Sequence, residues 1–242
     1  MNNGYSVLAE YYDKFTEQDC DYLGWSQYLC SVAQKYKVRS VADIACGTGK
    51  MTELLVKSGY EVVGIDASQQ MLSEAVGKCG ATFVRQDMRK LQLLRKADMA
   101  VCVNDGVNYL KPSELSGFFK RVADNLNLGA PFVFDLSSPY KLRNVVSNNV
   151  FYLDSLNETL LWVNKLYGDR VEMDLTLFVK RGELYERKEE RHVQYIHEDS
   201  SVRASLEEAG FEVKRVTRDY GKKLSPKSSR ITYYAVKRQS AQ

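Results

Sequence analysis

An aspartate near the end of the first predicted buried strand and two glycines after it offer the clearest chemistry in the sequence. The segment Asp43-Ile-Ala-Cys-Gly-Thr-Gly49 leads directly into a predicted helix, Lys50–Lys57. Because glycine has no Cβ, Gly47 and Gly49 allow the backbone to turn tightly and to approach a ligand closely. The first amides of the helix can donate hydrogen bonds to a carboxylate or a phosphate. This pattern predicts a nucleotide-binding turn.

Two further carboxylates follow the next two predicted strands. Asp66 ends the second strand, where a carboxylate can accept both hydroxyls of an adenosine ribose, and Asp87 follows the third strand. Open α/β sheets bind ligands at the carboxyl ends of their strands, so these acids should surround one crevice. Nicotinamide-dependent oxidoreductases and S-adenosylmethionine-dependent enzymes both use the glycine turn and the second acid. The third acid favours the second class.

The chain resembles the class I, Rossmann-like, S-adenosylmethionine-dependent methyltransferases. Their pattern Asp-x-Gly-x-Gly-x-Gly is present with Ala45 in place of the first glycine. The resemblance covers Arg39 to Asp135 and extends to the C-terminal pair of strands. It implies that S-adenosyl-L-methionine is the cofactor.

The resemblance also implies roles for individual residues. Asp43 would orient the methionine end, Asp66 would hold the ribose, and Asp87 would accept a hydrogen bond from the adenine amino group. The adenine itself is expected between Ala67 and Met88. The implied cofactor contacts are Tyr5, Asp43, Ala45, Cys46, Gly47, Gly49, Asp66, Ala67, Met71, Asp87, Met88 and Asn104.

Two flanking segments, Tyr5 to Asp13 and Val103 to Leu110, look like those of small-molecule methyltransferases such as glycine N-methyltransferase and the sugar N,N-dimethyltransferases. In those enzymes an N-terminal helix covers the cofactor, and an antiparallel insertion after the fifth strand shapes the acceptor site. Tyr5, Ala9 and Tyr12 would share one face at helical spacing. That face could contact the cofactor or pack on the sheet.

Methyl transfer from a sulfonium needs no nucleophilic side chain, because the leaving group is already good and the main requirement is alignment in a dry pocket. An amine or hydroxyl acceptor does have to lose a proton. Candidates for orientation or base catalysis are Tyr12, Asn104 and Asp105, followed by Asp13, His192 and His197. No metal site is expected, because the five cysteines are scattered and have no histidine at ligand spacing.

The elements that would position these residues alternate between short apolar runs and helical stretches from Arg39 to Asp135, a pattern typical of a parallel sheet covered on both faces. A helix with an apolar stripe from Leu115 to Leu126, opened by Ser113 and closed by Gly129, should pack on this sheet. The predicted strands are Ser40–Ala45, Glu61–Asp66, Thr82–Arg85, Met99–Asn104 and Pro131–Leu136.

After Tyr140 the pattern changes to strict alternation of apolar and polar residues. The segment Val150 to Ile196 predicts a meander of about four antiparallel strands. A helix ending at Gly210 and two strands, Phe211–Thr217 and Arg230–Lys237, return the chain to the main sheet. We expect a doubly wound α/β fold with a mostly parallel seven-stranded sheet and a reversed last strand. Residues 1–140 and 197–242 would form the methyltransferase domain with its N-terminal helical lid, and residues 141–196 an antiparallel cap on the acceptor site.

Composition narrows the range of partners. The 242 residues suffice for one sizeable core, and the net charge of +3 is too small to indicate a polyanionic partner. Nine basic and two acidic residues from Phe211 to Gln242 are best explained as a solvated face. We expect a cytoplasmic monomer or homodimer with a small-molecule methyl acceptor, without nucleic acid or membrane as partner. Two alternatives are an NAD(P)-dependent oxidoreductase and a non-catalytic S-adenosylmethionine-binding regulator.

Overall fold

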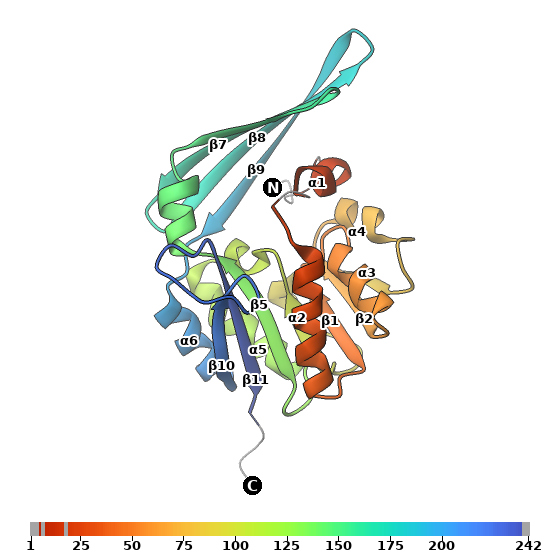
Figure 1. Ribbon diagram of the computed structural model, residues 1–242, viewed down its shortest axis with the longest axis vertical. Coiled ribbons are helices and arrows are strands. Elements are labelled where there is room, and N and C mark those ends of the chain that lie inside the picture. Colours follow the sequence, from red (N-terminus) through yellow and green to blue (C-terminus); the bar gives the residue numbers. More distant parts are fainter. Residues whose placement is uncertain (1–4, 6–7, 17–18, 239–242) are drawn as a thin grey trace.

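The computed structural model describes residues 5, 8–16 and 19–238, which form a central sheet and a second, smaller sheet above it (Figure 1). The central sheet has seven strands in the order β10-β11-β5-β4-β1-β2-β3. β11 is antiparallel to both of its neighbours and all other pairings are parallel, so the predicted reversed last strand is confirmed. The strands are β1 (Ser40–Ile44), β2 (Glu61–Asp66), β3 (Thr82–Arg85), β4 (Met99–Cys102), β5 (Pro131–Ser137), β10 (Phe211–Arg218) and β11 (Arg230–Lys237).

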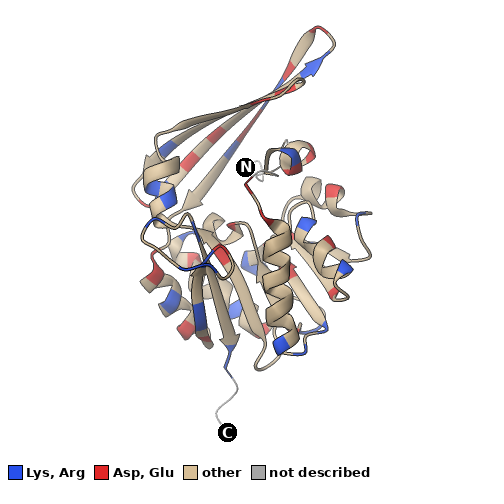
Figure 2. Ribbon diagram, viewed as in Figure 1, with Lys and Arg blue, Asp and Glu red and all other residues tan. Residues whose placement is uncertain are grey.

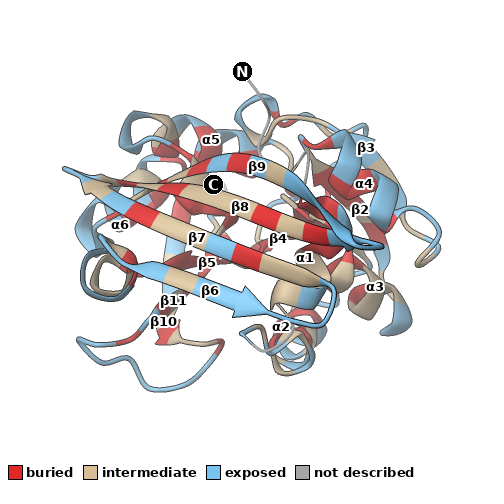
Figure 3. Ribbon diagram, turned by 90° about the horizontal axis from the view of Figure 1, so that it is seen from above, coloured by how far each residue is buried: buried red, intermediate tan, exposed pale blue. Residues whose placement is uncertain are grey.

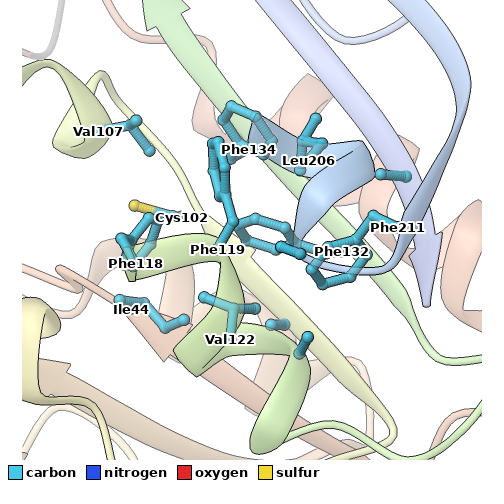
Figure 4. Close-up of a cluster of buried hydrophobic side chains, with 14 of the residues drawn as sticks. Ile44, Cys102, Val107, Phe118, Phe119, Val122, Phe132, Phe134, Leu206 and Phe211 are labelled. Atoms are coloured by element: carbon cyan, nitrogen blue, oxygen red, sulfur yellow. The ribbon is translucent and has the colours of Figure 1, made fainter. Parts of the chain in front are cut away.

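Helices cover both faces of the central sheet because its strands carry apolar side chains on both sides. In β5, Phe132 and Phe134 pack on α5 and α6, whereas Val133 packs with α2 and α3 on the opposite face. The first of these clusters is drawn in Figure 4. The helices are α1 (Ala9–Thr16), α2 (Tyr22–Lys35), α3 (Lys50–Lys57), α4 (Gln69–Ala75), α5 (Leu115–Asp124) and α6 (Asp199–Glu208), with shorter helical turns at η1 (Met88–Lys90), η2 (Gly106–Tyr109), η3 (Pro112–Glu114) and η4 (Lys141–Val146).

Several predicted boundaries shift for local reasons. β1 and β4 end before Ala45 and Asn104, because both residues take left-handed backbone angles, with φ of 56° and 59°. A strand cannot continue through that conformation. The helix predicted from Ser113 begins at Leu115 instead, after the separate short turn η3. Tyr5 precedes α1, which begins at Ala9, so the predicted helical face shared by Tyr5, Ala9 and Tyr12 is wrong for Tyr5.

The second sheet is antiparallel, with the order β6-β7-β8-β9, as the alternating sequence predicts. It lies over the carboxyl ends of the central strands, and its edge strand β6 is largely exposed (Figure 3). Leu177 and Val179 of β8 pack with Leu8 and Tyr11 of the N-terminal segment. The inner face of this sheet is therefore held against α1. The strands are β6 (Val150–Asp154), β7 (Glu158–Tyr167), β8 (Arg170–Arg181) and β9 (Leu184–Tyr195).

Candidate active site

A cavity of about 250 Å³ opens at the carboxyl ends of β1, β2 and β4, below the N-terminal segment. Its volume is close to the lower end of the usual range for ligand sites, about 300–1,000 Å³. Eleven of the predicted site residues line this cavity: Tyr5, Tyr12, Ala45, Cys46, Gly47, Asp66, Ala67, Met71, Asp87, Met88 and Asn104. Three others, Asp43, Gly49 and Asp105, do not.

The glycine turn after β1 shows why two glycines are needed, for two different reasons. A Cβ added at Gly47 would meet no atom within 4 Å, so this residue leaves the cavity wall open. A Cβ added at Gly49 would lie 2.9 Å from Cβ of Ala75, so this glycine permits close packing of α3 on α4. Cys46 precedes Gly47, and burial raises the pKa of its thiol well above the usual value. A protonated, buried thiol behaves as a small apolar side chain at this wall.

Asp66 is fixed by backbone amides on both sides of the cavity. Its Oδ2 accepts from the amide of Gly47 at 2.8 Å, and its Oδ1 accepts from the amide of Ser68 at 2.8 Å. Burial raises the pKa of this carboxyl, although these amide hydrogen bonds favour its charged form. Each carboxylate oxygen has a further lone pair, so a ligand with two adjacent hydroxyls could be accepted here.

Asp87 is already paired within the chain. Arg89 donates to it from Nε at 3.0 Å and from Nη2 at 2.7 Å, and its backbone amide adds a third hydrogen bond. Burial alone would raise the pKa of Asp87, but these hydrogen bonds outweigh it and lower the pKa. Arg89 also lines the cavity and was not predicted as a site residue. The sequence does offer one signal for Arg89 as a site residue, because it follows Asp87 by only two positions.

Asp43 lies beneath the cavity wall and is fully buried. Its Oδ2 accepts from the hydroxyl of Thr52 at 2.5 Å, while Oδ1 has no hydrogen-bond partner among the described residues. Burial raises the pKa of this carboxyl to about 7. A buried acid with an unpaired oxygen suits a cationic ligand nearby, since a positive charge would stabilise the carboxylate. The surroundings of Asp43 therefore fit the positively charged methionine end of adenosylmethionine.

The raised pKa of Asp43 gives a prediction for stability. An unfolded aspartate has a pKa of about 3.9, so the folded protein holds this proton more tightly. The stability contributed by that proton is complete below about pH 4 and is lost as the pH rises to about 7. Asp43→Asn cannot ionise and should gain stability relative to the wild type across this window, by at most about 4 kcal/mol. Urea unfolding of both proteins at several pH values measures it, and a constant difference would contradict the assignment.

A strained turn follows β4 and is held by one buried acid. Asn104 and Asp105 both have positive φ, and their backbone amides donate to Asp135 at 2.8 and 2.7 Å. Asp135 is fully buried and also accepts from Nη1 of Arg230 at 2.5 Å and from the hydroxyl of Tyr220. Two of these partners come from the C-terminal part of the chain, far from the turn in sequence. The network therefore fixes the position of Asn104 at the cavity wall.

The carboxamide of Asn104 is oriented from both ends. Its Oδ1 accepts from Nη2 of Arg230 at 3.0 Å, so its Nδ2 faces the tyrosines and donates to Tyr12 at 2.8 Å and to Tyr22 at 3.3 Å. The predicted base candidate Asp105 instead turns away from the cavity, where it accepts from Ser137 at 2.9 Å and from Gln194 at 3.0 Å. Sequence reasoning did not single out Asp135, Tyr22 or Arg230.

The two histidines, both base candidates from the sequence, are buried side chains. His192 and His197 are only 4% and 3% exposed. The ring of His192 lies 4.4 Å from the ring of Tyr5, which lines the cavity, whereas His197 contacts the backbone of Val107 and Leu110 and its pKa is lowered by burial. Asp13, another base candidate, accepts hydrogen bonds from the hydroxyl of Thr48 at 2.5 Å and from Nζ of Lys78 at 2.9 Å. It fastens α1 to the glycine turn.

Five exposed basic residues of the C-terminal stretch lie away from the cavity. None of Lys214, Arg215, Lys222, Lys223 and Lys227 lines it, and Lys214 pairs with Glu212 at 2.6 Å. Acidic and basic residues are mixed over the ribbon in Figure 2. Within the described part of the chain, no group of three or more metal-ligating side chains comes together. Nor is any helix there both long and apolar enough to cross a membrane.

Comparison with known proteins agrees with this geometry. The model of a methyltransferase domain family matches residues 41–129. A solved S-adenosylmethionine-dependent methyltransferase from Clostridium acetobutylicum ATCC 824 is 32% identical, and the match covers 96% of this chain and 98% of that one with a TM-score of 0.89. The Bacillus subtilis (strain 168) protein YqeM, whose name carries only a provisional methyltransferase assignment, is 30% identical over 96% of this chain and 97% of its own.

A third relative matches a shorter segment. The dTDP-3-amino-3,4,6-trideoxy-alpha-D-glucopyranose N,N-dimethyltransferase of Streptomyces venezuelae is 34% identical over 98 residues, which are 40% of this chain and 41% of the relative. The chain belongs to the S-adenosylmethionine-dependent methyltransferases.

Proposed function

We propose that this methyltransferase acts on a nitrogen or oxygen atom of a small molecule. The observation that carries the proposal is the charge of the cavity wall, where two basic residues, Lys50 and Arg89, are matched by two acidic ones, Asp66 and Asp87. A nucleic-acid methyltransferase needs a basic groove to neutralise phosphates. Tyr5 and Tyr12 of the N-terminal segment also line the cavity, and the name of the Streptomyces venezuelae relative gives an amino sugar as its acceptor.

The chain's residues would divide the work between cofactor and acceptor. Adenosylmethionine supplies an activated methyl group, and Asp66, Ala67 and Met88 would hold its adenosine part. Tyr12 and Asn104 would orient the acceptor for in-line attack, because the amide of Asn104 donates to the Tyr12 hydroxyl and leaves the Tyr12 proton free to point into the cavity. Residues 141–196 would form a cap over the acceptor, as their inner face lies against the N-terminal segment.

Transfer of labelled methyl groups tests this proposal. The purified protein is incubated with methyl-labelled adenosylmethionine and, separately, with a metabolite extract, total RNA and total DNA at low and high salt. We expect label in the metabolite fraction, with little dependence on salt. Label that enters mainly nucleic acid, and is lost at high salt, would overturn the small-molecule acceptor. Binding of the cofactor without any product would instead favour a non-catalytic regulator.

A further inference from the structure

A chain of polar side chains runs from the cavity to a buried carboxylate in the second sheet. The hydroxyl of Tyr5, on the cavity wall, lies 2.6 Å from the hydroxyl of Tyr109. The Tyr109 hydroxyl lies 3.3 Å from Nδ1 of His192, and Nε2 of His192 lies 3.1 Å from Oε1 of Glu190. These four residues come from the N-terminal segment, η2 and β9. The first two pairs are hydrogen-bonded, whereas Nε2 of His192 lies at ion-pair distance from Glu190 and makes no hydrogen bond among the described residues.

We propose that Tyr5, Tyr109 and His192 form a proton relay that removes the proton of the methyl acceptor, with Glu190 stabilising the charged imidazole. The proposal rests on the proposed nitrogen or oxygen acceptor, whose methylation leaves a positively charged group with a proton to lose. The family resemblance implies a cofactor contact for Tyr5 and assigns no role to Tyr109 or Glu190. The relay ends at the cavity wall, where Tyr5 also packs edge-on against Tyr12 at 5.3 Å between ring centroids.

The environment sets the direction of the relay. Burial raises the pKa values of Tyr5 and Tyr109, so both remain protonated and can donate. Tyr109 can donate to Nδ1 of His192 only if the imidazole carries its proton on Nε2, the nitrogen that faces Glu190. A histidine held as this tautomer by a carboxylate is a base at its other nitrogen.

Glu190 also contacts the N-terminal segment that carries Tyr5. It is 8% exposed, and its carboxylate accepts from the backbone amide of Tyr5 and, at 3.1 Å, from the amide of Leu8. The same carboxylate therefore fixes the segment that carries Tyr5 and lies 3.1 Å from the imidazole. Asp105, which accepts a hydrogen bond from Gln194, is a second carboxylate near Tyr109.

The proposed step balances as follows. The acceptor's lone pair forms the new bond to the methyl carbon, and the electron pair of the broken carbon–sulfur bond stays on sulfur, which leaves a neutral thioether. The methylated acceptor gives its extra proton to the Tyr5 oxygen, Tyr5 passes its own proton to Tyr109, and Tyr109 passes its proton to Nδ1 of His192. The imidazolium formed beside Glu190 later releases that proton to solvent. One proton leaves for each methyl group transferred.

The first test reads the tautomer of His192 directly and needs no acceptor. The chain has two histidines, so NMR of protein with isotopically labelled histidine gives two imidazole signals, and His197→Gln assigns them. At a pH about two units above the ordinary imidazole pKa of about 6.5, we expect His192 to carry its proton on Nε2. Tyr109→Phe should reduce the population of this tautomer. A wild-type His192 that carries its proton on Nδ1 would overturn the relay.

The second test measures transfer in the metabolite extract. We expect His192→Asn and Tyr109→Phe to lower kcat by about 10²–10⁴-fold, with little change in the affinity for S-adenosylhomocysteine. The control is Arg191→Gln, the exposed neighbour of His192 that pairs with Asp174, and it should match the wild type. Unchanged kcat in a folded His192→Asn protein would contradict the relay. If the wild type transfers no methyl group to the extract, the proposed acceptor fails instead, and the tautomer still decides the relay.

Discussion

Asp66→Asn is expected to weaken the binding of S-adenosylhomocysteine by about 5–150-fold. Both carboxylate oxygens are held in place by the amides of Gly47 and Ser68, so the acid is ready to accept a ribose diol without rearrangement. An asparagine keeps the shape but turns one acceptor into a donor. Leaving buried hydroxyls unpaired costs about 1–3 kcal/mol, which corresponds to that range of affinity. Isothermal titration calorimetry measures the change.

The matched control is Glu61→Gln at the opposite end of the same strand. Glu61 is exposed and begins β2, whereas Asp66 ends it at the cavity. This substitution removes one negative charge from β2 without touching the cavity, so affinity should stay at the wild-type value. If a folded Asp66→Asn protein binds as tightly as the wild type, the ribose is held by other residues.

Asp135→Ala should destabilise the fold by about 3–5 kcal/mol. Asp135 accepts hydrogen bonds from the amides of Asn104 and Asp105, from Tyr220 and from Arg230, and all four lose their partner at once. Removing one member of a buried ion pair leaves an uncompensated charge in the interior. The left-handed turn after β4 also loses its anchor, so cofactor binding should weaken along with stability. Urea unfolding followed by circular dichroism measures the loss.

Two further variants separate the buried charge from simple loss of a side chain. Asp174→Ala breaks an exposed pair with Arg191 and should cost no more than about 1 kcal/mol. Combining Asp135→Ala with Arg230→Met removes both charges and should recover part of the lost stability. If Asp135→Ala unfolds at the same urea concentration as Asp174→Ala, the network contributes little to the fold.

Much of the fold could be predicted because the elements have simple periodic patterns. The bounds of β2, β3, α3 and β11 agree with the sequence prediction. The four antiparallel strands β6 to β9 also lie within the predicted segment Val150 to Ile196. The helix α2 was not predicted, although Trp25, Leu29, Val32 and Ala33 follow helical spacing and Asp21 caps it. That signal was available. The ends of β1 and β4 could not be predicted from the sequence. They depend on positive φ at Ala45 and Asn104, a conformation that residues other than glycine adopt only in a minority of cases.

The site was predictable only where topology alone brings residues together. Acids at the ends of parallel strands must share one edge of the sheet, so Asp66 and Asp87 could be placed from the sequence. Arg230 and Asn104 are 126 positions apart, and Tyr5 and Glu190 are 185 apart. Contacts of this kind depend on how the second sheet and the last strand pack. A single sequence shows no pattern for them.

The central claim is that adenosylmethionine occupies the cavity after the glycine turn. A crystal structure of the complex with S-adenosylhomocysteine tests it most directly. The expected result is a ribose whose hydroxyls donate to Asp66, an adenine between Ala67 and Met88, and a sulfur that faces Tyr12 and Asn104. A ligand bound outside this cavity, or a ribose with no contact to Asp66, would contradict the account.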